Sequence, residues 1–297
     1  MLSDLIRSMR PRQWTKNLLI FAGLVFSRNA FEGPLVLRAV FAFFLFCLAS
    51  SCVYLVNDVY DASRDREHPL KRARPIASGR LSSRVALIVA LLGGGIAISA
   101  SFWLGWSVGI GPWFGLTTVS YILLMLLYTV SLRQFVIIDV LTIAIGFVIR
   151  AVAGAVVIDV EISSWLLVCT ILLALFLGLA KRRHEVLLLD ETAPSHRRSL
   201  VEYTPALLDQ MIAIVTAAVV VAYVLYTVWP DTVAKFGTTR LGLTLPIVLY
   251  GLFRYLYLIY RREEGGEPDR SLLEDKPLLL AVALWAITAA IIVYHMP

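Results

Sequence analysis

The chain alternates long apolar stretches with shorter polar connections. Each stretch approaches the roughly 20 residues with which a helix crosses about 30 Å of hydrocarbon. The pattern therefore predicts an all-α polytopic membrane protein with nine transmembrane helices, and the length favours one domain over residues 1–297. The nine stretches are residues 17–31, 36–57, 84–104, 108–130, 136–157, 163–180, 207–229, 240–260 and 277–295.

Composition and charge agree with a membrane protein and orient it. Hydrophobic residues make up 59% of the chain and charged residues 16%, whereas soluble domains carry about 25% charged residues. Of the 27 Lys and Arg residues, 22 lie in the N-terminal tail, in the loops after the second, fourth, sixth and eighth stretches, or at the membrane ends next to them. This asymmetry predicts that the N-terminus and those loops are cytoplasmic and that the C-terminus lies outside. The net charge of +6 thus indicates topology, and we expect no nucleic-acid partner.

An acidic cluster, "NDVYDASRD" at residues 57–65, stands where the second stretch ends. Asn57, Asp61 and Asp65 would share one face of a helix, with Asp58 on the adjoining edge. Like charges at this spacing repel each other, so a positive partner is expected. Mg²⁺ takes carboxylate oxygens together with substrate phosphates, and the cluster therefore predicts a magnesium–diphosphate site.

Basic residues follow the acids in "HPLKRARPIASGRLS". Lys71 and Arg74 are candidates to bind phosphate oxygens through charge-assisted hydrogen bonds. The alternative is an ordinary solvated loop in which the acids and bases pair among themselves.

Four further candidates lie near or within the apolar stretches. Lys16 and Asn17, in "RPRQWTKN", stand at the entrance of the first stretch, where a positive anchor is the alternative. Asp139 and Arg150 lie within the fifth stretch, and ionisable residues in a membrane usually face a cavity or a partner. Their separation is about 16 Å along a helix axis, so each needs its own partner. Arg150 could instead extend to the membrane surface.

A second basic cluster, "KRRHE…HRRSLVEY", follows the sixth stretch in a predicted loop over residues 181–206. Its substrate-binding candidates are Lys181, Arg182, Glu185, Arg197 and Tyr203. The alternative is positive charge that serves topology alone.

Together these motifs, with "YTVSLRQFVIIDVLTIAIGFVIRAVAGA" and "GGEPDRSLLEDKPLL", resemble the UbiA-type intramembrane prenyltransferase superfamily. Within it they look like the decaprenyl-phosphate phosphoribosyltransferase branch. The resemblance implies helices around a central cavity open to the cytoplasm, Mg²⁺ bound by Asp58, Asp61 and Asp65, a catalytic role for those acids and Asp139, and substrate binding by Asn57 and Arg133. The chain departs from the prenyl-transferring pattern at Ile143, one turn after Asp139, where a further aspartate is expected.

The activity implied by that branch is transfer of 5-phosphoribose from 5-phosphoribosyl 1-diphosphate to a polyprenyl phosphate in the plasma (inner) membrane, for lipid-linked pentose precursors of the cell envelope. One alternative is transfer of a prenyl group from a prenyl diphosphate to an aromatic acceptor. Another is a transporter or channel for an anionic lipid, although transporters often place their sites near mid-bilayer. Membrane lipids are expected partners, and a homo-oligomer is left open.

Overall fold

The computed structural model describes residues 1–67, 71–188, 198–262, 266 and 268–295. Its described part consists of helices and their connections, without strands, as the apolar pattern predicts. Contacts between Cα atoms divide the chain into two compact units, described separately below. The first is Met1–Thr142 with Gly146–Glu161, and the second is Ile143–Ile145 with Ile162–Pro297. The expectation of one catalytic domain stays a prediction.

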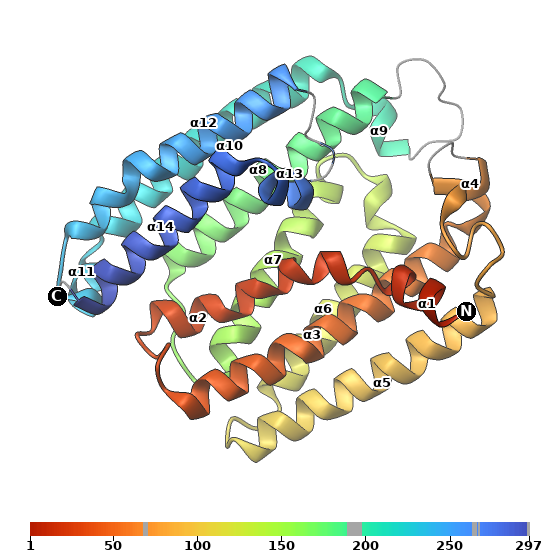
Figure 1. Ribbon diagram of the computed structural model, residues 1–297, viewed down its shortest axis with the longest axis horizontal. Coiled ribbons are helices and arrows are strands. Elements are labelled where there is room, and N and C mark those ends of the chain that lie inside the picture. The colour runs from red at the N-terminus through yellow and green to blue at the C-terminus, as the bar shows by residue number, and fades with distance from the viewer. Residues whose placement is uncertain (68–70, 189–197, 263–265, 267, 296–297) are drawn as a thin grey trace. The chain divides into compact units, whose positions relative to one another are not determined.

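The first unit is built around a long central helix. Helix α3 (Gly33–Tyr60) packs along α5 (Ser83–Ser107) and α6 (Trp113–Val130), as Figure 1 shows. Its buried small residues, such as Ala42 and Ala49, allow neighbouring helices to approach closely. The other elements are α1 (Leu2–Met9), η1 (Pro11–Ile20), α2 (Phe21–Phe26), α4 (Ala62–Glu67), η2 (Lys71–Ala73), η3 (Leu132–Gln134) and α7 (Ile138–Val157).

The second unit contains two helix pairs, α8 (Ser164–Leu188) with α10 (Pro205–Val228) and α12 (Leu245–Arg261) with α14 (Lys276–His295). Arg254 and Asp275 form an ion pair of 2.8 Å beside the start of α14. The hydrogen bond from Arg254 holds the pKa of the Asp275 carboxyl below its usual 3.8. The remaining elements are α9 (Arg198–Glu202), α11 (Pro230–Phe236), η4 (Arg240–Thr244) and α13 (Pro268–Glu274).

Eight of the nine predicted spans are confirmed as helices long and apolar enough to cross a membrane. Within the described residues these are α3, α5, α6, α7, α8, α10, η4 with α12 (Arg240–Arg261), and α14. The first predicted span, residues 17–31, instead falls on η1, α2 and the turn after them. A ten-residue 3₁₀ helix rising about 2 Å per residue and a six-residue α-helix rising about 1.5 Å would together extend about 29 Å. The first predicted span is therefore not confirmed as a membrane helix, although η1 and α2 together are long enough to approach the membrane thickness.

A side-chain hydrogen bond and a close backbone contact hold the N-terminal segment within the first unit. Trp14 Nε1 donates to Ser51 Oγ of α3 at 3.0 Å. On α7, a Cβ atom added at Gly154 would lie 2.0 Å from the carbonyl oxygen of Ile20, so only glycine fits this approach. Arg10, between α1 and η1, has a left-handed backbone with φ of 55°, an uncommon conformation for a residue other than glycine.

Candidate functional site

The acidic cluster lies at the end of α3, with the helical spacing that the sequence predicts. The amide of Asp61 donates to the carbonyl of Asn57 at 2.9 Å, and the amide of Asp65 donates to the carbonyl of Asp61 at 2.8 Å. Asp58, Asp61 and Asp65 are exposed by only 3%, 8% and 5%. Buried carboxylates need charge compensation, so their partners decide what the cluster can bind.

Two arginines from different segments bind Asp58 and Asp65. Arg10 Nη2 lies 2.5 Å from Asp58 Oδ1. Arg74 Nη1 lies 3.3 Å from the same oxygen and 2.7 Å from Asp65 Oδ2. Two guanidinium groups thus converge on one carboxylate oxygen. Arg74 also bridges two acids that lie seven positions apart in the chain.

A third arginine, Arg133 of η3, binds Asp61 in a bidentate pair. Its Nη1 and Nη2 donate to the two carboxylate oxygens at 2.7 Å and 2.5 Å, and Nη1 lies 3.4 Å from Asn57 Oδ1. The guanidinium is only 1% exposed. Burial by itself lowers the pKa of Arg133, but the hydrogen bonds and charge of Asp61 outweigh this and raise it above its usual range.

The donor set fits Mg²⁺ by its chemistry, because carboxylate oxygens are the ligands this ion prefers. In the described residues, however, no three His, Cys, Asp or Glu side chains form a group that could hold a metal ion. The three carboxylates are instead matched by the three arginine charges. A metal that binds here would have to share these oxygens with the guanidinium groups or displace them.

The two ionisable candidates of the fifth predicted span, Asp139 and Arg150, are both buried on α7. Asp139 is fully buried in the first turn of the helix, where the helix dipole favours a negative charge. Thr142 is 3% exposed and donates to the carbonyl of Ile138. Arg150 is 4% exposed and so does not extend to the membrane surface.

Arg150 binds neutral polar groups of the first unit. Its Nε donates to Asn17 Oδ1 at 2.7 Å, its Nη2 donates to Tyr121 Oη at 2.7 Å, and its Nη1 donates to the carbonyl of Gly146 at 3.0 Å. The guanidinium also stacks 4.6 Å from the Tyr121 ring centroid. The structure thus brings together Asn17 and Arg150, and half-buried Lys16 precedes Asn17 and donates to Gln13.

The candidates after the sixth span belong to the second unit. Lys181, Arg182 and Glu185 lie on α8, which continues to Leu188, so the predicted loop from residue 181 is wrong over these positions. Arg182 is 2% exposed and pairs with Glu185. Tyr203 is 3% exposed, and Arg197 lies outside the described residues.

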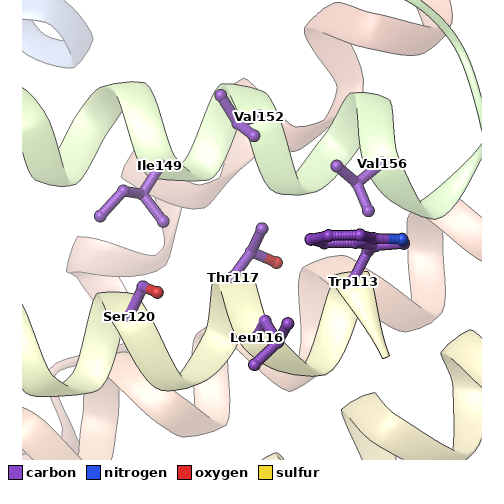
Figure 2. A pocket seen from close by; sticks show the side chains of 7 residues that line it. All are labelled: Trp113, Leu116, Thr117, Ser120, Ile149, Val152 and Val156. Atoms are coloured by element: carbon purple, nitrogen blue, oxygen red, sulfur yellow. The ribbon is translucent and has the colours of Figure 1, made fainter. Parts of the chain in front are cut away.

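An apolar groove of about 330 Å³ lies between α6 and α7 of the first unit. Figure 2 shows side chains from the two helices facing it, with Thr117 and Ser120 as its polar members. None of the predicted site residues lines it. The groove therefore adds nothing to the acidic site.

Arg10 is the functional candidate that sequence reasoning missed. It stands with Arg12 and Lys16 in a basic tail whose charges topology alone explains. Its contact with Asp58 spans 48 positions, which no local pattern indicates. The weak signal was the arginine immediately before a proline, a position that disfavours helix.

Comparisons with known proteins agree with the motifs. The profile of the UbiA prenyltransferase family matches residues 17–274. A Corynebacterium glutamicum protein named decaprenyl-phosphate phosphoribosyltransferase is 33% identical over 99% of this chain and 87% of its own length. A Mycobacterium tuberculosis protein of the same name is 31% identical over 97% and 93%. A solved structure of a UbiA homologue from Archaeoglobus fulgidus bound to DMAPP and Mg²⁺ has a TM-score of 0.72 over 99% of this chain and 100% of its own, at 16% identity, which supports the fold alone.

Proposed function

We propose that this chain, which belongs to the UbiA prenyltransferase family, transfers 5-phosphoribose from 5-phosphoribosyl 1-diphosphate to a polyprenyl phosphate and releases diphosphate. The observation that carries the proposal is the identity of 31–33% to relatives named decaprenyl-phosphate phosphoribosyltransferase over 97–99% of the chain. The acidic and basic residues of the first unit supply the groups that a diphosphate substrate requires. The lipid product would serve as a pentose precursor for the cell envelope.

The chain is an integral membrane protein, and we propose that its acidic site opens to the cytoplasm of the plasma (inner) membrane. The basic loops around the acids support this orientation through the positive-inside rule. A water-soluble sugar diphosphate would then enter from the cytoplasm. The polyprenyl tail would stay in the bilayer with its phosphate at the site.

The acids would hold the diphosphate through a divalent cation. Asp58, Asp61 and Asp65 are the proposed ligands of Mg²⁺, which when bound would act as a Lewis acid on the leaving diphosphate. Lys71 and Arg74 would bind phosphate oxygens as the charge on the leaving group grows. Arg133 would hold Asp61 in position through its bidentate contact with the carboxylate, and Asn57 would support Arg133 by accepting from its Nη1.

The chemistry makes modest demands on the protein. An oxygen of the lipid phosphate forms a bond to ribose C1, while the bond from C1 to the diphosphate oxygen breaks and its electron pair leaves with diphosphate. Because the attacking phosphate is already an anion, no strong general base is needed. Catalysis would come from positioning and from electrostatic stabilisation of the leaving group.

We propose substrate-binding roles for two more groups of residues, one in each unit. Asp139 would stabilise the positive charge that develops on the ribose or bind its hydroxyls, and Lys16 would bind a phosphate from the segment that Asn17 and Arg150 hold. In the second unit, the proposed substrate-binding residues are Lys181, Arg182, Glu185, Arg197 and Tyr203.

The test is a transfer assay with purified full-length protein in detergent. Radiolabelled phosphoribosyl diphosphate, polyprenyl phosphate and Mg²⁺ are incubated, and label is counted in the organic phase. We expect label there only when lipid and metal are both present. Transfer of a labelled prenyl group from prenyl diphosphate to an aromatic acceptor, with no phosphoribosyl transfer, would replace the proposal with the alternative activity of the family.

Asp61→Asn tests the acidic site itself. We expect it to abolish lipid product, with Asp4→Asn as a control because Asp4 lies on α1 outside the cluster. Lipid product formed by Asp61→Asn at the wild-type rate would remove the acids from the proposal.

A further inference from the structure

The acidic cluster contains its own counter-ions, which distinguishes it from an open metal site. Asp58, Asp61 and Asp65 carry three negative charges when ionised, and Arg10, Arg74 and Arg133 bring three positive charges into direct contact with them. A divalent cation entering alone would add two positive charges to a buried cluster in which each carboxylate already contacts an arginine. It would also displace guanidinium groups that would have no new anion to bind.

A diphosphate changes this balance. It brings several negative charges and oxygen acceptors whose spacing suits bidentate arginine contacts. A guanidinium that leaves a carboxylate can then bind a phosphate oxygen, and the freed carboxylate oxygen can bind the metal. Metal and diphosphate therefore favour each other's binding. The diphosphate gives the displaced guanidinium a new anion to bind, and the metal neutralises the carboxylate that the guanidinium leaves.

The three arginines differ in their freedom to make this exchange. Arg133 is 1% exposed and bidentate on Asp61, so its departure would take a bidentate partner from a buried carboxylate. The side chains of Arg10 and Arg74 are 27% and 28% exposed, and they share one oxygen of Asp58. That oxygen keeps one partner when the other guanidinium moves.

Arg10 is placed for such a movement. Its left-handed backbone, φ 55° and ψ 61°, joins α1 to η1, and its guanidinium lies 5.0 Å from the ring centroid of Tyr54. Residues held in sparsely populated backbone conformations persist where the surroundings fix them, and they cluster at ligand clamps. The aromatic face gives the guanidinium a surface to slide across without losing contact.

We propose that Arg10 is a phosphate-binding residue that closes the acidic site to a free divalent cation until a diphosphate arrives. In the free protein its guanidinium occupies Asp58, and on substrate binding it moves to a phosphate oxygen. Metal and diphosphate therefore bind together. The inference rests on the metal role of the acids in the proposed function, and it is independent of which group is transferred.

The test measures bound metal, not turnover. Equilibrium gel filtration of the full-length protein in detergent, with radioactive Mn²⁺ as the probe, gives metal bound per protein at matched free Mn²⁺, with and without inorganic diphosphate. We expect diphosphate to tighten Mn²⁺ binding by about tenfold or more, within the usual range of coupling between sites. Equal Mn²⁺ binding in the two conditions would overturn the proposal.

Variants of Arg10 then assign the coupling to this side chain. With Arg10→Ala we expect Mn²⁺ alone to bind several-fold more tightly than in the wild type, diphosphate to bind more weakly, and the coupling to shrink. If Arg10→Ala does not fold, Arg10→Lys replaces it in the test. This variant keeps the charge and should retain part of the coupling. Arg12→Ala is the matched control, because Arg12 is an exposed arginine of the same segment. This substitution removes one positive charge, as Arg10→Ala does.

The outcomes separate this inference from the proposed function. Coupled binding of metal and diphosphate in a protein that transfers no phosphoribose would sustain the role of Arg10 and reject the proposed activity. Phosphoribosyl transfer by a protein whose Mn²⁺ binding does not change with diphosphate would support the proposed activity and reject the role of Arg10. Arg10→Ala and Arg12→Ala with the same altered coupling would reduce the effect to net charge and reject the assignment to Arg10.

Discussion

Arg150 provides a direct test of how a buried charge stabilises the first unit. Its guanidinium is nearly inaccessible, and its hydrogen bonds go to Asn17, Tyr121 and the carbonyl of Gly146. Methionine has a similar length and no polar hydrogen-bond donors. Arg150→Met therefore removes three hydrogen bonds while preserving most of the packing volume.

The expected loss follows from the groups left behind. The side-chain oxygens of Asn17 and Tyr121 would each lose a partner inside the unit, at about 1–3 kcal/mol per buried group, or about 2–6 kcal/mol for the two. Hydrogen bonds within membrane proteins average about 0.6 kcal/mol each, so three such bonds set a lower figure of about 2 kcal/mol. We expect a loss of about 2–4 kcal/mol in the free energy of unfolding.

A double-mutant cycle with Asn17→Leu measures the contact directly. Unfolding of the detergent-solubilised protein by denaturant is followed by intrinsic fluorescence for the wild type, the two single variants and the double variant. Once Asn17 is absent, Arg150→Met should destabilise less, by at least about 1 kcal/mol, because contacting residues are not additive. Arg240→Met, at an exposed arginine, should leave stability unchanged. Additive single losses, or an Arg150→Met protein as stable as the wild type, would refute the reasoning.

Three other predictions use the same unfolding measurement. Gly154→Ala should lose about 1–3 kcal/mol through overpacking, whereas Gly251→Ala, whose added Cβ meets nothing within 4 Å, should lose none; equal losses would contradict this. Arg133→Met removes the bidentate partner of the buried Asp61 carboxylate and should cost about 3–5 kcal/mol, and a variant as stable as the wild type would be the contrary result. The lowered pKa of Asp275 means that its stabilisation is complete above about pH 3.8 and is lost as pH falls through the folded value, so Asp275→Asn should flatten the acid limb of the stability profile and lower stability at neutral pH.

Hydrophobic periodicity predicted most of the fold because membrane helices are long and uniformly apolar. The prediction of helix boundaries failed where a helix continues into polar sequence or where an apolar stretch is not an α-helix. Helix α8 carries Lys181 and Glu185 beyond the apolar stretch and ends at Leu188, since a helix can continue past the hydrocarbon without apolar residues. The first stretch is shorter than a membrane α-helix, and its first residues complete a 3₁₀ helix over Pro11–Ile20, which hydropathy does not distinguish from an α-helix.

The candidate site shows a similar limit. Helical spacing correctly placed the acids on successive turns, because that spacing is a local property of the chain. Their partners are remote in sequence: Arg10 lies 48 positions before Asp58, and Arg133 lies 72 positions after Asp61. Charge pairs of this kind depend on which segments the fold brings together, and a single sequence carries no periodic signal for them.

The N-terminal segment connects the acidic site to the packing of the first unit. It is held at three levels: Arg10 on Asp58, Asn17 on Arg150, and Ile20 against Gly154. Of these contacts, only the first can exchange its partner for a phosphate, because the second is buried and the third joins backbone atoms. A change at Arg10 upon substrate binding would therefore be absorbed locally by the turn before η1, while Lys16 keeps its place beside Asn17. In the proposed roles, Arg10 would be the cation that moves to the substrate and Lys16 the cation that stays in place. Such a division is expected where one charge closes an empty site and another positions the ligand that fills it.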